Sequence, residues 1–135
     1  MVIALREVPE QLIPNLGIAD ISKASDGVVK VKSMVEKPNI NEAPSKTAII
    51  GRYILPPAIF DTLENISPGV LGEIQLTDAL STLLGRNSCY GFLFPGAHFD
   101  VGTPTGLLKA SIHMALNRDD SRVEFRKWLA QKLKT

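Results

Sequence analysis

Asp26-Gly27 is the sequence feature that most constrains the fold, because it separates two runs of strand-like composition, 17–22 and 28–36. Asp-Gly favours a tight hairpin turn, since both residues tolerate the positive φ angles that such turns require. In the second run, apolar and charged residues alternate, which predicts a strand with one buried face. The expected buried face carries Val29, Val31 and Val35, and the opposite face carries Lys30, Lys32 and Glu36. We therefore expect an antiparallel hairpin.

Three other runs of apolar, β-branched or aromatic residues predict strands at 2–8, 47–55 and 89–94. Gly51, inside the second of these runs, indicates a β-bulge or the close approach of another group. Cys89 begins the last run and is expected to be a small core residue. A buried strand that starts at residue 2 leads us to expect that further chain normally precedes it.

Apolar residues at helical spacing predict four helices. The expected helices are a short one after Pro57, one over 73–84, one over 104–117 and a last one from Ser121. The residues expected to be buried are Ile59, Phe60 and Leu63; Leu76, Leu80, Leu83 and Leu84; Leu108, Ile112, Ala115 and Leu116; and Phe125, Trp128, Leu129 and Leu133.

Capping signals precede the last two helices. Thr103 followed by Pro104 is typical of a helix start, with Thr103 as the N-cap. Ser121 and Glu124 have the spacing of a capping box, in which each side chain bonds the backbone N–H of the other residue.

The order of these elements predicts an α/β fold, a mixed sheet that contains a β-hairpin and is followed by C-terminal helices. We expect residues 1–103 to form the ligand-binding region and 104–135 to form helices for packing and oligomer contact. No glycine-rich strand-to-helix turn of the kind that cradles a nucleotide phosphate occurs in the sequence.

The composition excludes several classes of function. Fifteen Lys and Arg oppose 14 Asp and Glu, so the net charge of +1 gives no field for a nucleic acid or an anionic membrane. No stretch approaches the roughly 20 apolar residues of a membrane helix, and the N-terminus does not read as a signal peptide. The single cysteine cannot form an internal disulfide, which fits a reducing compartment. We expect a cytoplasmic protein with no nucleic-acid or membrane partner.

Glu36-Lys37-Pro38 is the first candidate site. A carboxylate accepts hydrogen bonds from sugar hydroxyls, and an ammonium meets a phosphate as a point charge. Neighbours on an ideal strand point to opposite faces, so both side chains reach one ligand only at the strand end or where Pro38 turns the backbone. The alternative is an exposed ion pair worth about 0–1 kcal/mol.

Asp100 is the second candidate, because it lies between a strand and the start of a helix. A carboxylate there suits Mg²⁺, which takes one or two carboxylates and completes its shell with phosphate oxygens and water. The alternative is that Asp100 only fixes the loop before the helix. The acidic residues of Gly72-Glu73-Ile74-Gln75-Leu76-Thr77-Asp78 are explained by the helix dipole alone. His98 and His113 have no second cysteine to complete a zinc site, and no nucleophilic catalytic set is apparent.

Five segments together carry a family resemblance: GIADI, VKSMVEKP, APSKTAIIGRYIL, SPGVLGEIQLTDAL and HFDVGTPTGLLKA. In this order they resemble the C-terminal half of bacterial UTP–glucose-1-phosphate uridylyltransferases, which belong to the sugar-1-phosphate nucleotidylyltransferases. The resemblance covers roughly residues 2–117. It implies the sugar-binding half of a Rossmann-like nucleotidyltransferase fold.

The resemblance also implies a reaction, in which UTP and glucose 1-phosphate give UDP-glucose and diphosphate with Mg²⁺ present. By this likeness Glu36 holds sugar hydroxyls, Lys37 holds the sugar phosphate and Gly17 lets backbone approach the hexose. Asp100 is then one of two aspartates that hold Mg²⁺. The GEIQLTD segment is expected to support the sugar site. No residue of this chain is expected to be catalytic.

The sequence also departs from the family pattern. It lacks a G-x-G-T-R loop and the first metal aspartate, and Leu16 stands where the family has an aromatic residue. We therefore expect no turnover by the chain alone. The alternative function is a non-catalytic sugar-phosphate-binding or assembly module. Because half of the fold is absent, we expect open strand edges, uncovered apolar faces and a homo-oligomer, formed for example by strand exchange.

Overall fold

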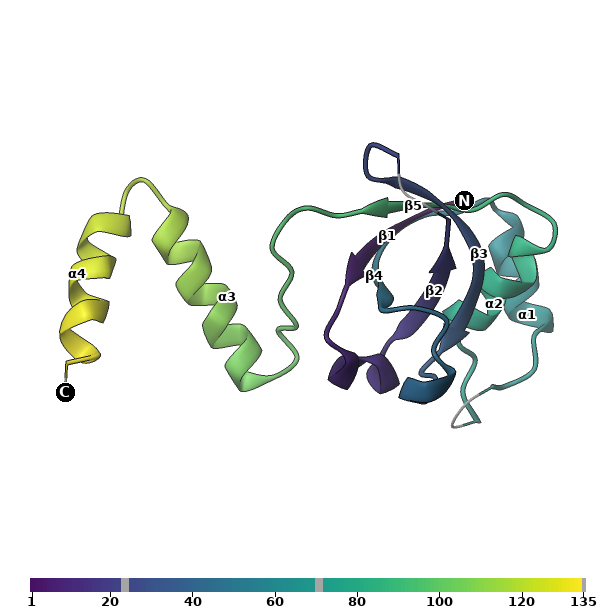
Figure 1. Cartoon of the computed structure of the whole chain (residues 1–135), viewed down its shortest axis with the longest axis horizontal. Helices are drawn as coiled ribbons and strands as arrows, with labels where there is room; N and C mark the ends of the chain where they lie inside the picture. Colours follow the sequence, from purple (N-terminus) through teal and green to yellow (C-terminus); the bar gives the residue numbers. More distant parts are fainter. Residues whose placement is uncertain (23–24, 70–71, 135) are drawn as a thin grey trace. The chain divides into compact units, whose positions relative to one another are not determined.

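The computed structural model describes residues 1–22, 25–69 and 72–134. It forms two compact units, residues 1–95 and 96–135 (Figure 1). The expected functional boundary between residues 103 and 104 stays a prediction. Among the described residues, no helix has the length and apolar character needed to cross a membrane.

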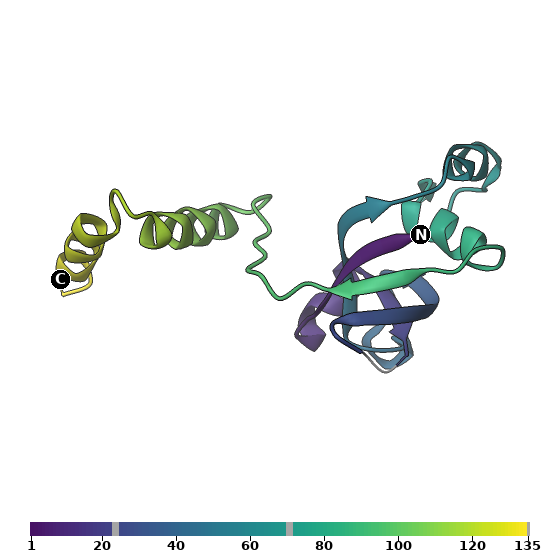
Figure 2. The ribbon, with the colours of Figure 1, turned by 90° about the horizontal axis from the view of Figure 1, so that it is seen from above.

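The first unit contains a closed barrel of five strands in the order β1-β4-β2-β3-β5 (Figures 1 and 2). The strands are β1 Val2–Glu7, β2 Gly17–Ile21, β3 Val28–Glu36, β4 Thr47–Ile54 and β5 Tyr90–Leu93. β1 pairs with β5 in parallel, and the other pairs are antiparallel. The mixed sheet predicted from the sequence is confirmed.

Barrel closure corrects the expectation of open strand edges, because each of the five described strands pairs on both sides. Gly91 in β5 makes this closure possible. A Cβ added at Gly91 would overlap Leu5 and lie 2.9 Å from Val29 Cγ2. Only a residue without a side chain therefore lets β5 lie between β1 and β3 at this point.

The hairpin predicted at Asp26-Gly27 is confirmed. Asp26 has φ 51° and Gly27 has φ 77°, and Ser25 bridges to Val28 across the turn. Positive φ at both central residues is the signature of the tight turns that match the twist of a β-hairpin. Residues 23 and 24, which were not expected to lie in a strand, are outside the described residues.

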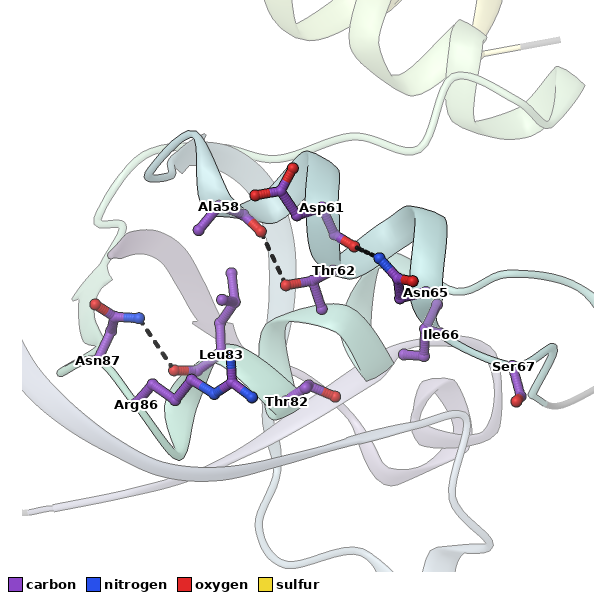
Figure 3. A pocket seen from close by; sticks show the side chains of 10 residues that line it. All are labelled: Ala58, Asp61, Thr62, Asn65, Ile66, Ser67, Thr82, Leu83, Arg86 and Asn87. Carbon is purple, nitrogen blue, oxygen red and sulfur yellow. Dashed lines mark hydrogen bonds between the residues drawn. The ribbon is translucent and has the colours of Figure 1, made fainter.

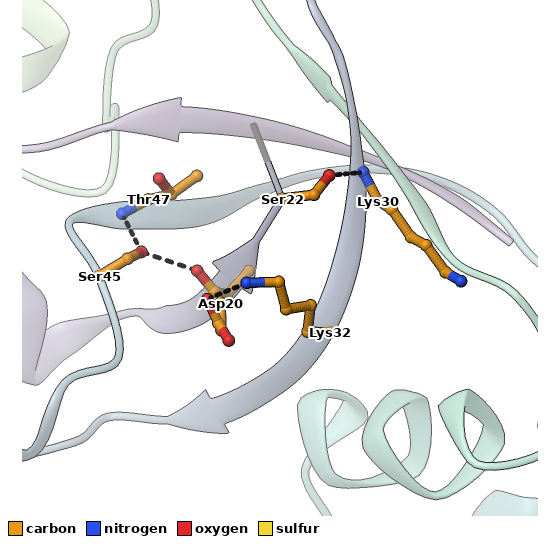
Figure 4. A network of polar contacts seen from close by, with 7 residues as sticks. Asp20, Ser22, Lys30, Lys32, Ser45 and Thr47 are labelled. Carbon is orange, nitrogen blue, oxygen red and sulfur yellow. Dashed lines mark hydrogen bonds and ion pairs between the residues drawn. The ribbon is translucent and has the colours of Figure 1, made fainter. Parts of the chain in front are cut away.

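A β-bulge in β3 changes which residues face inward. Asp20 pairs with Ser33 but Ile21 pairs with Val31, so Lys32 is an extra residue on β3. Its ammonium lies 3.6 Å from Asp20 Oδ1, in the polar network of Figure 4. Because the side-chain period of a strand is two, one extra residue reverses the faces beyond it.

The reversal makes part of the predicted pattern wrong. Val29 and Val31 are buried as expected, but Val35 is 41% exposed. Met34 is buried in its place. Glu36 therefore lies on the same face of β3 as Met34. The simple alternation had predicted that it lies on the face of Lys30.

A second irregularity interrupts β4, where the sequence indicated a bulge at Gly51. Ile3 pairs with Tyr53 and Leu5 with Ile49, which leaves two extra residues on β4. Gly51 has φ 90° and Arg52 has φ 54°. No described atom lies within 4 Å of a Cβ added at Gly51, so the glycine serves the backbone conformation and not a close approach.

Two α-helices complete the core of the first unit, α1 Ala58–Asn65 and α2 Leu76–Leu84. α2 packs against β3 and α1, and it buries Leu80 and Leu83 as predicted. Ile59 of α1 is buried as well, but Phe60 is 69% exposed, so its predicted burial is wrong. Adjacent helical residues point about 100° apart, and α1 offers only one face to the core.

Some element boundaries differ from the prediction, and two short helices were not predicted. α2 begins at Leu76 and not at residue 73. Two short 3₁₀ helices, Glu10–Asn15 and Ile40–Glu42, occupy connections that carried no helical periodicity. The first of them contributes Ile13 to a small second core cluster with Ile18 and Ala48.

The second unit contains α3 Pro104–Asn117 and α4 Arg122–Lys132. Thr103 caps α3, with its Oγ1 accepting a hydrogen bond of 3.1 Å from the Gly106 N–H, as predicted. Ser121 lies at the N-cap of α4, but its hydroxyl bonds Asp120 and makes no capping bond. The predicted capping box is therefore not formed.

The expected burial along these two helices is only partly confirmed, because five of the eight residues are half-buried: Ile112, Ala115, Leu116, Phe125 and Leu129. Neither α3 nor α4 contains a buried residue. Leu108 is 63% exposed, Trp128 is 50% exposed and Leu133 is 79% exposed. Phe125 and Trp128 stack on each other within α4, with ring centroids 5.6 Å apart.

Candidate functional site

The candidate site lies where β3 ends beside the start of β2. Glu36 is the last residue of β3 and pairs with Gly17, the first residue of β2. The bulge at Lys32 determines on which face of β3 Glu36 lies. The side chain of Glu36 is only 12% exposed. An ionised carboxylate in this position can accept hydrogen bonds from a ligand that donates them.

Lys37 follows at once but does not point away, as an ideal strand would require. Its φ of 46° takes the backbone out of the extended conformation, and its N–H donates to the Leu16 carbonyl at 3.1 Å. The ammonium Nζ consequently lies 3.9 Å from Glu36 Oε1. The structure brings Glu36 and Lys37 to the same place, which resolves the geometric difficulty posed by the sequence.

The second carboxylate oxygen of Glu36 faces Gly17 and the first turn of α2. A Cβ added at Gly17 would lie 3.0 Å from Glu36 Oε2 and 2.8 Å from Thr77 Oγ1. Thr77 is 7% exposed, and its Oγ1 faces this position. We call these four residues, Gly17, Glu36, Lys37 and Thr77, the β3 corner.

The charge of the same carboxylate also affects the pKa of Tyr53 in β4. Burial raises the pKa of the Tyr53 phenol above its ordinary value of 10.0, and the negative charge of Glu36 raises it further. Both causes disfavour the phenolate. Tyr53 therefore stays a neutral hydroxyl near Glu36 at physiological pH.

Of the four predicted site residues, Gly17, Glu36 and Lys37 lie together in the first unit. Asp100 belongs to the second unit. Its Oδ1 accepts a hydrogen bond of 2.9 Å from the Gly102 N–H. A Cβ at Gly106 would overlap the Asp100 carbonyl oxygen, so the loop folds closely onto the first turn of α3. The carboxylate itself is exposed.

Few side chains of the described residues are placed to act together as ligands of a metal ion. Within residues 1–22, 25–69 and 72–134, no group of three or more His, Cys, Asp or Glu side chains could hold a metal ion. Asp100 offers one exposed carboxylate, which matches the way Mg²⁺ is held when phosphates supply most of its ligands. Cys89 is fully buried in the core, as predicted, and burial raises its pKa above the ordinary value of 9.0.

A separate hollow of about 510 Å³ lies between α1 and α2, and Figure 3 shows the side chains that line it. Several polar side chains that line it already donate hydrogen bonds to backbone carbonyls. Thr62 Oγ1 donates to Ala58 and Asn87 Nδ2 donates to Leu83. We favour the β3 corner as the ligand site, because there a carboxylate and an ammonium converge beside Gly17.

Sequence reasoning missed Thr77 and Tyr53 as individual site residues. Thr77 lies in the GEIQLTD segment, which was expected to support the sugar site, but the pattern did not single out its hydroxyl. Tyr53, whose pKa the charge of Glu36 raises, follows the bulge at Gly51 and Arg52, and the two extra residues there set its position on β4. In the sequence, only the glycine hinted at this geometry.

Comparison with known proteins agrees with the resemblance found in the sequence. Residues 2–116 match the family described as Nucleotidyl transferase. A UTP–glucose-1-phosphate uridylyltransferase of Streptococcus pneumoniae serotype 4 is 42% identical over 130 residues, which are 96% of this chain and 44% of that protein.

Solved structures show the same likeness. A UDP-glucose pyrophosphorylase in complex with UDP-glucose superimposes with a TM-score of 0.80 and 39% identity, over 87% of this chain and 44% of that one. A UTP-bound enzyme from Acinetobacter baumannii gives 0.81 and 34% identity, over 96% and 44% respectively. The chain thus spans less than half the length of these relatives. The match over residues 2–116 shows that the chain belongs to the nucleotidyl transferase family.

Proposed function

We propose that this chain is the sugar-phosphate-binding part of a UTP–glucose-1-phosphate uridylyltransferase. The observation that carries the proposal is the β3 corner, where the Glu36 carboxylate, the Lys37 ammonium and the backbone of Gly17 meet. Membership of the nucleotidyl transferase family supports it. The relatives named as uridylyltransferases and the complex with UDP-glucose support the choice of substrate.

The two charged groups divide the ligand between them. Glu36 accepts hydrogen bonds from hexose hydroxyls, because an ionised carboxylate is only an acceptor. Lys37 meets the phosphate as a compact positive charge. Repulsion between Glu36 and the phosphate then fixes which end of the sugar phosphate faces Gly17.

In the proposed reaction, an oxygen of the glucose 1-phosphate attacks the α-phosphorus of UTP. The bond from that phosphorus to the bridging oxygen of the β-phosphate breaks, and diphosphate leaves. The residues of this chain hold and orient the attacking group, which lowers the barrier by positioning and not by covalent catalysis.

Asp100 is proposed as one carboxylate ligand of Mg²⁺. Its Oδ1 is fixed by the Gly102 N–H, which orients the carboxylate. When bound, the ion supplies positive charge against the negative charge of the phosphates. The sequence of this chain contains no G-x-G-T-R loop, and each lost stabilising contact costs on the order of 10²–10³ in rate. We therefore propose that the chain alone has no turnover.

Calorimetry with glucose 1-phosphate tests the proposal. Replacing Lys37 by Ala removes a charged contact to the phosphate, which is worth roughly 1.5–3 kcal/mol, or about ten- to 150-fold in affinity. Lys30→Ala is the matched control, because Lys30 is an exposed lysine on β3, the strand that ends just before Lys37. Equal affinities of the unaltered chain and Lys37→Ala would remove Lys37 from the site.

A diphosphate-release assay with UTP, glucose 1-phosphate and Mg²⁺ tests the proposed inactivity of the chain alone. Sugar-phosphate binding without release is expected from the chain alone, and it also describes the alternative, a non-catalytic binding module. Clear turnover by the unaltered chain would refute the proposed inactivity.

Self-association also stays a proposal, and cytoplasmic location stays a prediction. Because the barrel is closed, strand exchange through open edges no longer explains why the chain would self-associate. Apolar side chains on the outer surface of the strands remain, among them Ile54, which is 72% exposed, and Tyr90. Light scattering is expected to show an oligomer, and a monodisperse monomer would count against it.

A further inference from the structure

The hollow between α1 and α2 is lined by two opposite charges that the proposed function does not use. Asp61 of α1 lies on one side of it, and Arg86, which follows α2, lies on the other (Figure 3). Neither side chain forms an ion pair, with the other or with a further residue of the described chain. Two unpaired charges of opposite sign in one hollow are complementary to a ligand that carries both signs.

The polar side chains beside Asp61 direct their donors to their own helix. Thr62 Oγ1 donates to the Ala58 carbonyl at 2.9 Å, and Asn65 Nδ2 donates to the Asp61 carbonyl at 2.7 Å. A hydroxyl has a single hydrogen, so Thr62 can only accept a further hydrogen bond, and the Asn65 amide oxygen is an acceptor as well. The α1 side of the hollow therefore offers a carboxylate and neutral acceptors, which suit an ammonium group.

Arg86 supplies a charged donor on the opposite side. A guanidinium stays protonated at physiological pH and matches a carboxylate with two parallel hydrogen bonds. Leu83, which is 2% exposed, and the half-buried Ile66 form the apolar part of the lining. The volume of about 510 Å³ is within the usual range of small-molecule sites. The lining thus fits a small molecule with an ammonium, a carboxylate and an apolar group.

We infer that this hollow binds a zwitterionic small molecule, a free amino acid with an apolar side chain, whose ammonium meets Asp61 and whose carboxylate meets Arg86. The inference goes beyond the proposed function and does not depend on it, because no residue that lines the hollow belongs to the β3 corner. Glucose 1-phosphate is not expected to bind here, since it has no positive group for Asp61. The hollow is then the site of a second ligand, in addition to the sugar phosphate.

The test titrates the unaltered chain with leucine and follows its amide ¹H–¹⁵N signals. Shifts are expected at Asn65, Arg86 and Asn87, and none at Gly17 or Lys37. Two analogues of leucine each lack one charge, because isopentylamine has no carboxylate and isocaproate has no ammonium. Each analogue is expected to bind about fivefold more weakly than leucine, which is the upper end of what an ion pair near the surface contributes.

Two variants assign the two ion pairs. In Asp61→Asn, leucine and isocaproate are expected to bind equally, because the ammonium has lost its partner. In Arg86→Gln, leucine and isopentylamine are expected to bind equally for the corresponding reason. Comparing ligands within each variant isolates the pairwise contact from any effect on folding. Glu64→Gln is the matched control and is expected to keep the preference for leucine, since Glu64 is an exposed carboxylate of α1 that does not line the hollow.

Helix dipoles offer a competing explanation for the two charges. Asp61 lies in the first turn of α1 and Arg86 lies just past the end of α2, where charges of these signs are favoured without a ligand. If the dipoles are the whole reason, both variants lower the urea midpoint while leucine causes no shifts. Absence of shifts in the unaltered chain, equal affinity for leucine and both analogues, or an undiminished preference for leucine in the two variants would each overturn the inference.

Discussion

Helix α2 in the first unit and helix α3 in the second carry apolar residues at the same helical spacing, but they bury them very differently. Leu80 of α2 is fully buried, whereas Leu107 and Leu108 of α3 are 54% and 63% exposed. α2 packs against β3 and α1, and within its own unit α3 packs against α4. Apolar spacing determines that a helix forms, whereas burial depends on which surface opposes it.

The largest expected difference concerns the stability of these two helices. Leu80→Ala removes a fully buried side chain and is expected to lower the free energy of unfolding by about 2–5 kcal/mol. Leu108→Ala changes a mostly exposed side chain and is expected to stay within about 0.5 kcal/mol. Urea unfolding followed by circular dichroism measures both, and similar losses would abolish the contrast between the units.

Replacing one glycine in each unit by alanine tests the same contrast, with a smaller expected loss of stability. Gly17→Ala places a methyl group 2.8 Å from Thr77 Oγ1 and 3.0 Å from Glu36 Oε2, and overpacking of this kind costs about 1–3 kcal/mol. In the second unit, Gly102→Ala meets only Asp100 Oδ1, at 3.1 Å, and is expected to cost less. Gly17→Ala is also expected to abolish glucose 1-phosphate binding, which calorimetry detects. Unchanged binding would show that the space over Gly17 is not used.

The smallest expected effect is a pH dependence in the core of the first unit. Burial raises the folded-state pKa of the Cys89 thiol above its ordinary value of 9.0. Folding therefore binds a proton more tightly, so this contribution is complete below pH 9 and is lost as the pH rises through the folded-state pKa. Unfolding midpoints of the unaltered chain should fall more steeply above pH 9 than those of Cys89→Ala. Parallel curves would contradict this assignment.

Local signals predicted the parts of the fold that depend on local chemistry. Asp26-Gly27 predicted the hairpin because its turn needs positive φ at both residues, and Thr103 predicted a helix start because its hydroxyl caps Gly106. Gly51 predicted a bulge for the same kind of reason. In each case a few neighbouring residues determine the conformation.

Features that depend on pairing between distant segments were not predictable from one sequence. The bulge at Lys32 arises from the register of β3 on β2, so simple alternation placed Val35 inside and Glu36 on the wrong face. Lysine gives no signal for the positive φ that brings Lys37 beside Glu36. Thr77 reaches Gly17 only because α2 packs against the barrel.

The most direct test of the central claim is an amide ¹H–¹⁵N correlation spectrum of the chain titrated with glucose 1-phosphate. We predict that the largest shifts occur at the β3 corner, at the amides of Gly17, Glu36, Lys37 and Thr77. Little change is expected at Arg86 and Asn87, which line the hollow between α1 and α2. Shifts concentrated at that hollow, with the β3 corner unchanged, would contradict the account.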